Sequence, residues 1–397
     1  MNLHRISRTA KVSVVSAAMV LGLASCSLDY TVGYVYMTTN KSNPGVIDQY
    51  AIDFDSGALS QIGTPVAAGN DPVTLVAAPN GQFVYVINQG DSTVQEFVVQ
   101  GDGTLASQHV YPTGGAHPTA VAIDPQGAFL YVTNSYAAGA STGTGVVSIF
   151  PVNADNSLGT SLTPQPVGIN PVGVTVSYFN HFVYVVEQQT SITGLILGFS
   201  QNAMTGELTP VSGTTIAGTA GNSVVTGYAA GVTPSAIVEE PTSRFVYVTD
   251  QAANQLIGYT VLPSGGLSAM VNGPFPTGLF PANITIDPTG KLIYVVNYNP
   301  STVQGYMIDS VTGTPSGVVG ASAVGTGTGP TCVAVDPALG DFLYTSNSLD
   351  NTVTGERLSP NTGSLSGVQN SPFNGSAAPT CLAIVPNGPH ATQAIIP

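Results

Sequence analysis

Positive charge is scarce in this sequence of 397 residues, which has only 7 Lys and Arg against 21 Asp and Glu. Three of the basic residues, Arg5, Arg8 and Lys11, lie near the N-terminus, so the rest of the chain keeps 4 basic residues against 21 acidic ones, a net charge of −17. Such a chain repels nucleic acid and anionic membrane surfaces, so neither is expected as a direct partner.

Patterns typical of metal and cofactor sites are also missing from the sequence. No group of His and Cys residues has the spacing of a transition-metal site, and no run of Asp and Asn has the spacing of a calcium loop. No glycine-rich segment leads from a strand into a helix, as a nucleotide-binding loop requires. We therefore expect no metal and no cofactor.

One sequence block does recur along almost the whole chain, with the form Phe83-Val84-Tyr85-Val86-Ile87-Asn88 in its first complete copy. The tyrosines of successive blocks are 46 to 63 residues apart, a period typical of propellers and solenoids. Related blocks occupy residues 129–134, 182–187, 245–250, 292–297 and 342–347, and a looser copy occupies 34–38.

Each complete repeat contains the same series of short segments. A strand that begins with Pro comes first, as at residues 118–123, and a Pro/Gly turn such as 125–127 leads into the aromatic strand. A third strand and a Gly-x-Leu corner, as at 103–105, complete the unit. Short strands joined by such turns form one antiparallel sheet, so we interpret each repeat as a blade.

The two ends of the chain share one repeat. The first repeat starts at its aromatic strand, and the Pro-led strand that it lacks stands near the C-terminus at 379–385. This predicts an all-β fold, a seven-bladed β-propeller over residues 34–388, with the first blade split between 34–70 and 378–388. Pairing of 379–385 with the N-terminal blade would close the ring and leave no unpaired edge. The lack of tryptophan argues against quinoprotein propellers, whose repeats depend on tryptophan docking.

The N-terminal segment has the features of an export signal. Basic residues precede an apolar stretch at 12–24, which is too short to span a bilayer as a helix and is followed by Ser25-Cys26. This order resembles the bacterial lipoprotein signal, which implies cleavage before Cys26 and attachment of a lipid to its sulfur. An ordinary secretory signal with an incidental cysteine is the alternative.

The leader divides the rest of the chain. We expect a signal peptide at 1–25, a short tether at 26–33 and a C-terminal tail at 389–397. The protein is then extracytoplasmic and attached to a bacterial membrane through its N-terminal lipid only. By the lipoprotein resemblance, Ser27 after the cysteine permits transfer to an outer membrane or periplasm in a Gram-negative cell.

The other two cysteines, Cys332 and Cys381, occupy the same position of two successive repeats, within Pro-Thr-Cys. If the ring closes as predicted, they lie on the innermost strands of adjacent blades. An extracytoplasmic location permits a disulfide between them. The alternative is a pair of small buried thiols, because neighbouring inner strands can be too far apart for a bridge.

The block Pro-x-x-Val-Ala-x-x-Pro-x-Gly-x-Phe-x-Tyr-Val-x-Asn, best kept at 118–134 and 281–297, resembles the YVTN-type repeats of bacterial propellers. Over about residues 34–388 the chain is similar to the lactonase family, which includes 6-phosphogluconolactonase and the fungal muconate cycloisomerases. Members with lactone chemistry share a Gly-Pro-Arg-His segment and an Asn-Glu-Leu segment. The first corresponds here to residues 169–173, without Arg or His, and the second is partly kept at 186–188, so the resemblance carries over Glu187 alone.

One rim of the predicted ring collects the loops that enter the innermost strands and those that follow the second strands. A lactone hydrolase needs a general base, an acid for the leaving oxygen and donors for the oxyanion. The candidate catalytic residues on this rim are His117, Glu187 and Asp250, and the candidate ligand-binding residues are Asp71, Asn88, Asn134, Asn297 and Asn347. The alternative is turn capping by the Asn series and ordinary loop roles for the others.

The positions of arginines and insertions indicate which ligands suit this rim. Arg244 and Arg357, the arginines outside the leader, belong to a turn and a third strand away from the rim, which disfavours an anionic substrate. Insertions at 135–145 and 212–232 enlarge loops on the rim and mark it as the working face. We therefore expect a module that binds a small neutral ligand, a glycan or a protein. Hydrolysis of a neutral lactone by His117 with Glu187 or Asp250 is the alternative.

Overall fold

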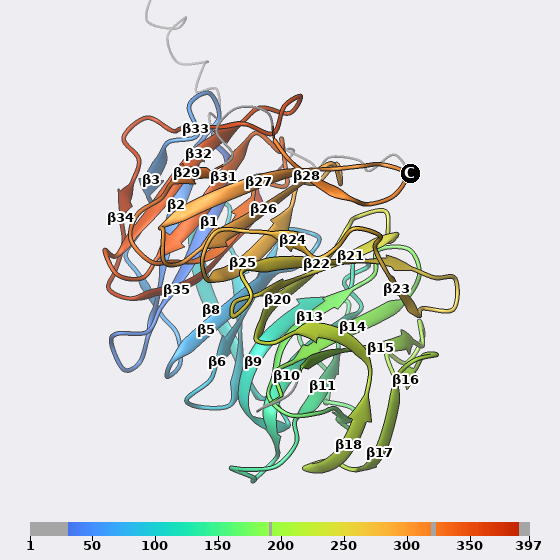
Figure 1. Cartoon of the computed structure of the whole chain (residues 1–397). Helices are drawn as coiled ribbons and strands as arrows, with labels where there is room; N and C mark the ends of the chain where they lie inside the picture. Colours follow the sequence, from blue (N-terminus) through green and yellow to red (C-terminus); the bar gives the residue numbers. More distant parts are fainter. Residues whose placement is uncertain (1–30, 190–192, 319–322, 389–397) are drawn as a thin grey trace, which may run out of the picture.

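The computed structural model describes residues 31–189, 193–318 and 323–388. Within these ranges the chain forms β-strands and no α-helix, and the strands build seven antiparallel sheets arranged in a ring and one separate two-stranded hairpin (Figure 1). This confirms the all-β, seven-bladed propeller. No helix that could cross a membrane occurs in the described part of the chain. The expected signal peptide, Cys26 and the tail at 389–397 lie outside the described residues.

Each blade has an innermost strand, two long middle strands and short outer strands. The innermost strands are β35 (Pro379–Pro386), β5 (Pro72–Ala77), β9 (Gly115–Ile123), β13 (Pro171–Val176), β20 (Pro234–Glu239), β25 (Pro281–Ile286) and β30 (Pro330–Val335), for blades 1 to 7 in turn. The second strands are β1 (Thr31–Thr39), β6 (Phe83–Asn88), β10 (Phe129–Ala137), β14 (Phe182–Glu187), β21 (Phe245–Asp250), β26 (Leu292–Asn297) and β31 (Phe342–Asn347). The third strands are β2 (Val46–Asp53), β7 (Thr93–Val99), β11 (Val146–Pro151), β15 (Gly194–Gln201), β22 (Gln255–Val261), β27 (Thr302–Ile308) and β32 (Thr352–Leu358).

The outer strands pair with the third strands, one in each of blades 2 and 3 and two in each of the other blades. In blades 1 to 4 they are β3 (Leu59–Gln61), β4 (Val66–Ala67), β8 (Leu105–Pro112), β12 (Gln165–Pro166), β16 (Leu208–Pro210) and β19 (Tyr228–Gly231). In blades 5 to 7 they are β23 (Leu267–Ala269), β24 (Phe275–Pro276), β28 (Pro315–Gly317), β29 (Ala323–Gly325), β33 (Leu365–Gly367) and β34 (Phe373–Asn374).

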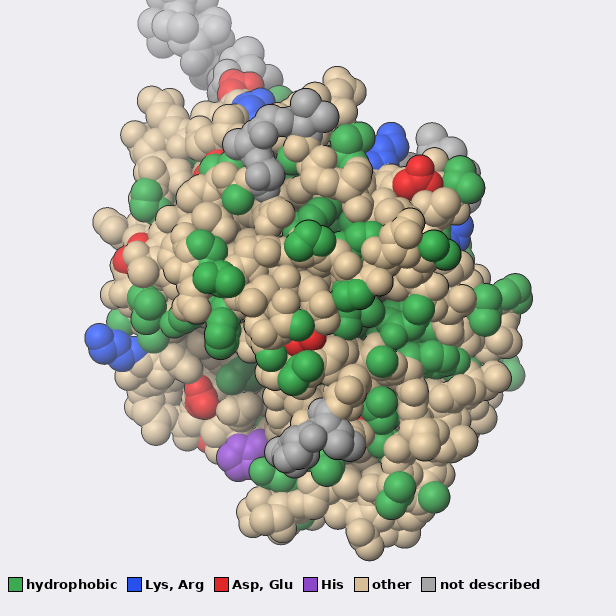
Figure 2. Space-filling model, viewed as in Figure 1, with side chains coloured by type: hydrophobic (Ala, Val, Ile, Leu, Met, Phe, Trp, Pro, Cys, Tyr) green, Lys and Arg blue, Asp and Glu red, His purple; other side chains and the backbone are tan. Residues whose placement is uncertain are grey.

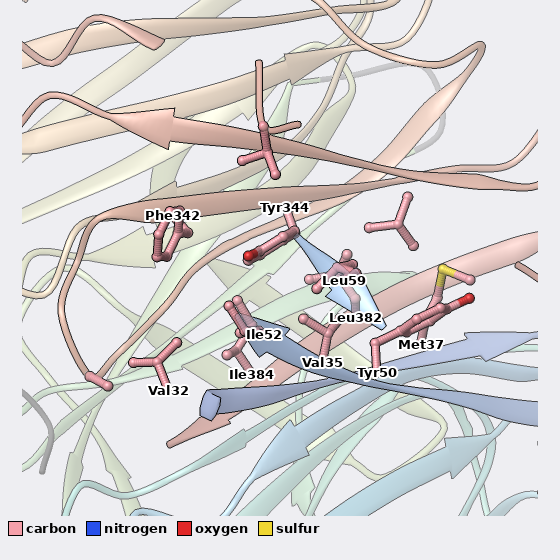
Figure 3. Close-up of a cluster of buried hydrophobic side chains, with 13 residues drawn as sticks. Val32, Val35, Met37, Tyr50, Ile52, Leu59, Phe342, Tyr344, Leu382 and Ile384 are labelled. Carbon is pink, nitrogen blue, oxygen red and sulfur yellow. The ribbon is translucent and has the colours of Figure 1, made fainter. Parts of the chain in front are cut away.

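The ring closes between the two ends of the chain, as the split repeat predicts. Strand β35 pairs antiparallel with β1, with Tyr36 opposite Ala383. Cys332 and Cys381 form a disulfide that joins β35 to the innermost strand of blade 7, with 4.9 Å between their Cα atoms. Figure 3 shows the apolar seam beside it, where Tyr344 packs with side chains from β1, β2 and β35. Strand β1 begins at Thr31, inside the segment expected to be a tether.

The repeated tyrosine joins each blade to the next. All seven tyrosines of the repeat block are fully buried, and each hydroxyl donates a hydrogen bond of 2.6 to 3.1 Å to a backbone carbonyl of the following blade. The last bond runs from Tyr344 to Gly57 and completes the circle. The donor and acceptor pairs are Tyr36 to Gly103, Tyr85 to Asn156, Tyr131 to Gly206, Tyr184 to Gly265, Tyr247 to Gly313, Tyr294 to Gly363 and Tyr344 to Gly57.

The acceptor residues explain the Gly corner of the repeat. Gly57 and Gly103 have φ near +72° and +81°, a region that favours glycine. A Cβ at Gly57 would lie 2.3 Å from the ring of Phe342, two residues before the tyrosine that bonds to the same glycine. The aromatic pair of one blade therefore covers the corner of the next with one ring and binds its carbonyl with the other. This link couples two motifs that the sequence shows as separate.

The two insertions contact each other. The second one folds into a hairpin, β17 (Thr215–Thr219) and β18 (Asn222–Thr226), which projects from the ring in Figure 1. Its tip receives a hydrogen bond from the backbone of Thr144 at the carbonyl of Gly221, and Ser223 donates to the Thr144 hydroxyl. Both insertions therefore belong to one structure beside blades 3 and 4.

Candidate functional site

The innermost strands surround a central channel. We call the end at which these strands begin the upper mouth, and the end at which they finish the lower mouth. Between them a cavity of about 260 Å³ is lined by residues of all seven innermost strands, including Thr119, Ser235 and Thr380. The lower mouth opens into a larger cavity of about 500 Å³.

The backbone at the upper mouth is unusual. In six of the seven blades the residue directly before the first Pro of the innermost strand has a positive φ, and five of these six residues are not glycine. The six residues are Asp71, His117, Asn170, Phe280, Gly329 and Ala378. A residue before Pro normally prefers extended conformations, so this geometry is strained. A β-bulge follows in the same strands, for example between Pro72 and Thr74, and turns the next side chain toward the neighbouring blade.

Polar side chains at the upper mouth connect the blades. The hydroxyls of Thr119, Ser235 and Thr380 donate to the carbonyls of Pro171, Pro281 and Pro72 in the following blade. In blades 2 and 4, where the equivalent residue is Val, the amide groups of Gln89 and Gln188 donate to Pro118 and Pro234 instead. These polar groups are therefore used to hold the ring together.

The Asn series expected to line the rim is buried inside the blades. Asn88, Asn134, Asn297 and Asn347 are each 0% exposed. Asn88 accepts a hydrogen bond from the backbone of Gly69 and donates to Thr93, and Asn347 donates to Thr352 and Thr354. Asn88 thereby fixes the segment that crosses from blade 1 to blade 2, whereas the other three bond within the hairpins of their own blades. Asp71, in contrast, lies at the mouth and accepts a hydrogen bond from Asn40.

The structure does not assemble His117 and Asp250 into an acid–base pair. The Asp250 carboxylate is fully buried and accepts four hydrogen bonds, from the backbone of Val232, Thr233 and Ala252 and from Gln255, at 2.9 to 3.2 Å. His117 is exposed, and its ring lies 5.9 Å from that of Tyr136 in an edge contact. Among the described residues, no hydrogen bond or ion pair joins His117 to either candidate acid.

Glu187 occupies a tighter environment. Burial raises the pKa of its carboxyl group to about 7, although hydrogen bonds from Gln189 and the Ile169 backbone oppose the shift. Its Oε2 atom has no hydrogen-bond partner among the described residues. A Cβ at Gly168 would collide with this oxygen, so the glycine makes room for the carboxyl group. Glu187 is 0% exposed and needs a local movement to reach a ligand at the mouth.

The arginines lie at the lower end of the ring. Arg244 directly precedes β21, donates to the Ser310 carbonyl and lies over the Phe245 ring. Arg357 pairs with Phe342, the first residue of β31, and donates to the Asp55 carbonyl. Since the second strands run from the lower end to the upper end, neither arginine reaches the upper mouth.

Several exposed side chains around the upper mouth are apolar. Ile169, Val232, Leu279, Phe280 and Leu349 are 41 to 62% exposed and lie just before an innermost strand or just after a second strand. Figure 2 shows how few charged side chains one face of the molecule carries and how apolar ones are spread among the neutral polar surface. Beside the charged side chains of Asp71 and Lys41, the upper mouth therefore offers apolar and neutral polar contacts.

The sequence-based prediction missed Glu239, the last residue of β20. It lines the lower cavity, is 8% exposed, and has both carboxyl oxygens 2.7 Å from the Ser177 hydroxyl. Burial raises the pKa of this carboxyl group to about 8 against the effect of the Ser177 hydrogen bond. A signal was present in the sequence, because the register-equivalent residues of the other six innermost strands are apolar: Ala77, Ile123, Val176, Ile286, Val335 and Ile384.

Comparison with protein families matches residues 34–168 and 180–335 to the lactonase family, described as a 7-bladed beta-propeller. The comparison with curated proteins found no match.

Solved structures with the same fold are numerous. A proposed 6-phosphogluconolactonase from Bacteroides uniformis has a TM-score of 0.71 and 19% identity, with 89% of this chain and 100% of that chain covered. The periplasmic gluconolactonase of Pseudomonas aeruginosa has a TM-score of 0.70 and 18% identity, with 89% of this chain and 99% of that chain covered. At these identities the likeness shows the fold alone.

Proposed function

Because the chain belongs to the lactonase family of seven-bladed β-propellers, we propose that it is a lipid-anchored, extracytoplasmic member that binds a neutral ligand at its upper mouth rather than hydrolysing a phosphorylated lactone. One observation carries the proposal. Neither candidate acid is available to act with His117. Asp250 is held by four hydrogen bonds, and Glu187 is buried.

The charges support a neutral ligand. A phosphate group needs a fixed cation, usually an arginine with two donors, and both arginines of the described residues lie at the lower end. The excess of acidic residues repels a dianion further. Apolar side chains such as Phe280 and Leu349 suit the carbon skeleton of an uncharged molecule, and the exposed ring of His117 can donate or accept one hydrogen bond.

Hydrolysis of a neutral lactone is the second candidate, and Glu187 favours it. A carboxyl group with a pKa of about 7 can accept and return a proton near neutral pH, as a general base must. The Pseudomonas aeruginosa protein of the same fold is described as a periplasmic gluconolactonase, a name that implies a neutral lactone outside the cytoplasm.

The deciding assay measures hydrolysis of glucono-1,5-lactone and of its 6-phosphate by the purified protein and by a His117→Ala, Glu187→Gln double variant. We expect no turnover of either lactone above the rate of the double variant. Turnover of the neutral lactone that the double variant loses would support the second candidate. Efficient turnover of the phosphorylated lactone would refute the proposal.

The anchor is tested separately. Replacing Cys26 by Ala should release the protein from membranes, because no other lipid attachment is expected and a processed signal leaves no apolar tether. Fractionation in high salt distinguishes the two states. Retention of the Cys26→Ala variant in the membrane fraction would show that the lipoprotein proposal is wrong.

A further inference from the structure

The lower mouth of the channel breaks the repeat in one place. Six innermost strands place an apolar side chain at this level, whereas β20 places the carboxyl group of Glu239 there. Burying an acid without need costs stability, and an apolar residue in its place would cost nothing. Glu239, the exception in one blade of seven, is therefore more readily explained by a role in binding than by a role in stabilising the fold.

The cavity around Glu239 has the size and lining of a small-molecule site. Its volume is about 500 Å³, and its walls come from six different blades. The lining is mostly apolar, with Pro79, Pro125, Pro288 and Pro337 from the turns between first and second strands. Tyr178, which is 42% exposed, adds an aromatic ring to the wall and forms an edge contact with Phe179. Such a cavity with a single buried polar group matches the usual composition of ligand pockets.

The charged groups around Glu239 leave its carboxyl group without a cation. Glu240 also lines the cavity, but its carboxylate is engaged by Arg244 at 3.8 Å and by the Thr242 hydroxyl. Arg244 in turn bonds to the Ser310 carbonyl on the next blade. Ser177 and Ser243 supply the hydrogen bonds to Glu239, and the Tyr184 hydroxyl also interacts electrostatically with it. No Lys, Arg or His among the described residues forms an ion pair with Glu239. A positively charged partner for its carboxylate would therefore come from a ligand.

We propose that the lower mouth binds a small organic amine, with its ammonium group on the carboxylate of Glu239 and its apolar body against Tyr178 and the prolines that line the cavity. A cation is favoured because an ammonium group stabilises the ionised form of Glu239, which faces the cavity, and because the acidic residues of the chain outnumber the basic ones. The aromatic wall adds a favourable cation–π contact. Anionic ligands are disfavoured by the excess of acidic residues.

Binding is coupled to a proton. At neutral pH the Glu239 carboxyl group holds its proton, because its pKa is about 8. An ammonium group stabilises the carboxylate, so the complex forms with release of one proton from Glu239 to solvent. Affinity for an amine should therefore rise as the pH increases from 6 to 8.5, a range in which the amine itself stays protonated.

The test uses calorimetric titration of the purified full-length protein with three probes of one shape: benzylamine, benzyl alcohol and benzoate. We expect saturable binding of benzylamine in a ratio of one to one, at least tenfold stronger than that of benzyl alcohol, and no binding of benzoate. Glu239→Gln keeps the size and the hydrogen bonds of the side chain, and it should weaken benzylamine at least tenfold without changing benzyl alcohol. Glu207→Gln, an exposed acid on an outer corner, removes the same net charge and should leave benzylamine affinity unchanged.

Three results would overturn the proposal. The first is the absence of saturable benzylamine binding to the wild-type protein. The second is equal weakening by Glu239→Gln and Glu207→Gln, which would indicate attraction by net charge alone. The third is tighter binding of benzyl alcohol than of benzylamine, which would indicate a neutral ligand at this mouth. Unfolding curves of both variants show whether each is folded before the titration is interpreted.

Discussion

Asp250 and Glu239 are both acids buried in blade 5, at opposite ends of the channel, and their surroundings differ. At the upper mouth Asp250 accepts four hydrogen bonds, two from the backbone of the segment that enters β20, one from the backbone of Ala252 and one from Gln255. At the lower mouth Glu239 is bonded by serine hydroxyls and faces a cavity. Burial of an acid therefore does not mark a functional site by itself. The number of donors that satisfy it separates an acid that holds the fold from one that is available to a ligand.

The largest difference should appear in stability. Asp250→Ala removes the acceptor of four hydrogen bonds from the interior of the blade and should lower the free energy of unfolding by about 3–5 kcal/mol. Glu239→Val restores the residue type of the other blades and should change it by less than about 1 kcal/mol, or raise it. Urea unfolding of both variants measures this. Equal losses of unfolding free energy in the two variants would contradict the view that Asp250 stabilises the fold and Glu239 does not.

The pH dependence of stability sharpens the same contrast. In the unfolded chain Glu239 ionises near its ordinary pKa, whereas in the folded protein burial raises the pKa to about 8. Between these two pKa values the folded state binds more protons than the unfolded state. The contribution of Glu239 to the free energy of unfolding is therefore fully present below its ordinary pKa and is lost as the pH rises through 8. Glu187 and Glu356, with pKa values raised by burial to about 7, act in the same direction over a narrower range.

The experiment compares urea unfolding of the wild type and of Glu239→Gln at intervals from pH 5 to 8.5. The wild type should lose stability relative to the variant by about 1 kcal/mol per pH unit over this range. Parallel curves would mean that the Glu239 carboxyl group is ionised in the folded protein and that the lower mouth does not hold a neutral acid.

The smallest effect should come from the links between blades. Tyr344→Phe removes the hydroxyl that donates to Gly57 across the closing seam, and it should cost about 1–2 kcal/mol. Tyr298→Phe, a half-buried tyrosine just after β26 at the upper mouth, should cost less than about 0.5 kcal/mol. Neither variant should alter the affinity for benzylamine. A change in that affinity with Tyr344→Phe would show that closure of the propeller affects ligand binding at the lower mouth.

The sequence predicts the fold well because each strand and turn of the repeat has a recognisable local sequence pattern. The Pro-led strands, the aromatic strands and the divided first repeat are each visible in the chain, and the structure has the closed seven-bladed ring that they indicate. The link from Tyr344 to Gly57 could not be predicted in the same way. It joins residues 287 positions apart in the sequence, and only the circular arrangement brings them together.

The site was harder to predict, for a physical reason. Position in the repeat places Asn88 and Asp250 at the end of a second strand, but it does not show whether the side chain turns outward or back onto the chain. The backbone donors of the crossing segments, such as Gly69 and Thr233, draw these side chains inward. Glu239 could have been found by comparing the repeats position by position, because an acid among six apolar residues is a clear departure.

A crystal structure of the protein soaked with benzylamine at pH 8.5 tests the contrast between the two mouths most directly. The account predicts the ammonium group within about 3 Å of the Glu239 carboxylate, a hydrogen-bonded ion-pair distance, with the ring against Tyr178 and no ligand near Asp250. Benzylamine bound at the upper mouth, with the lower cavity empty, would contradict it.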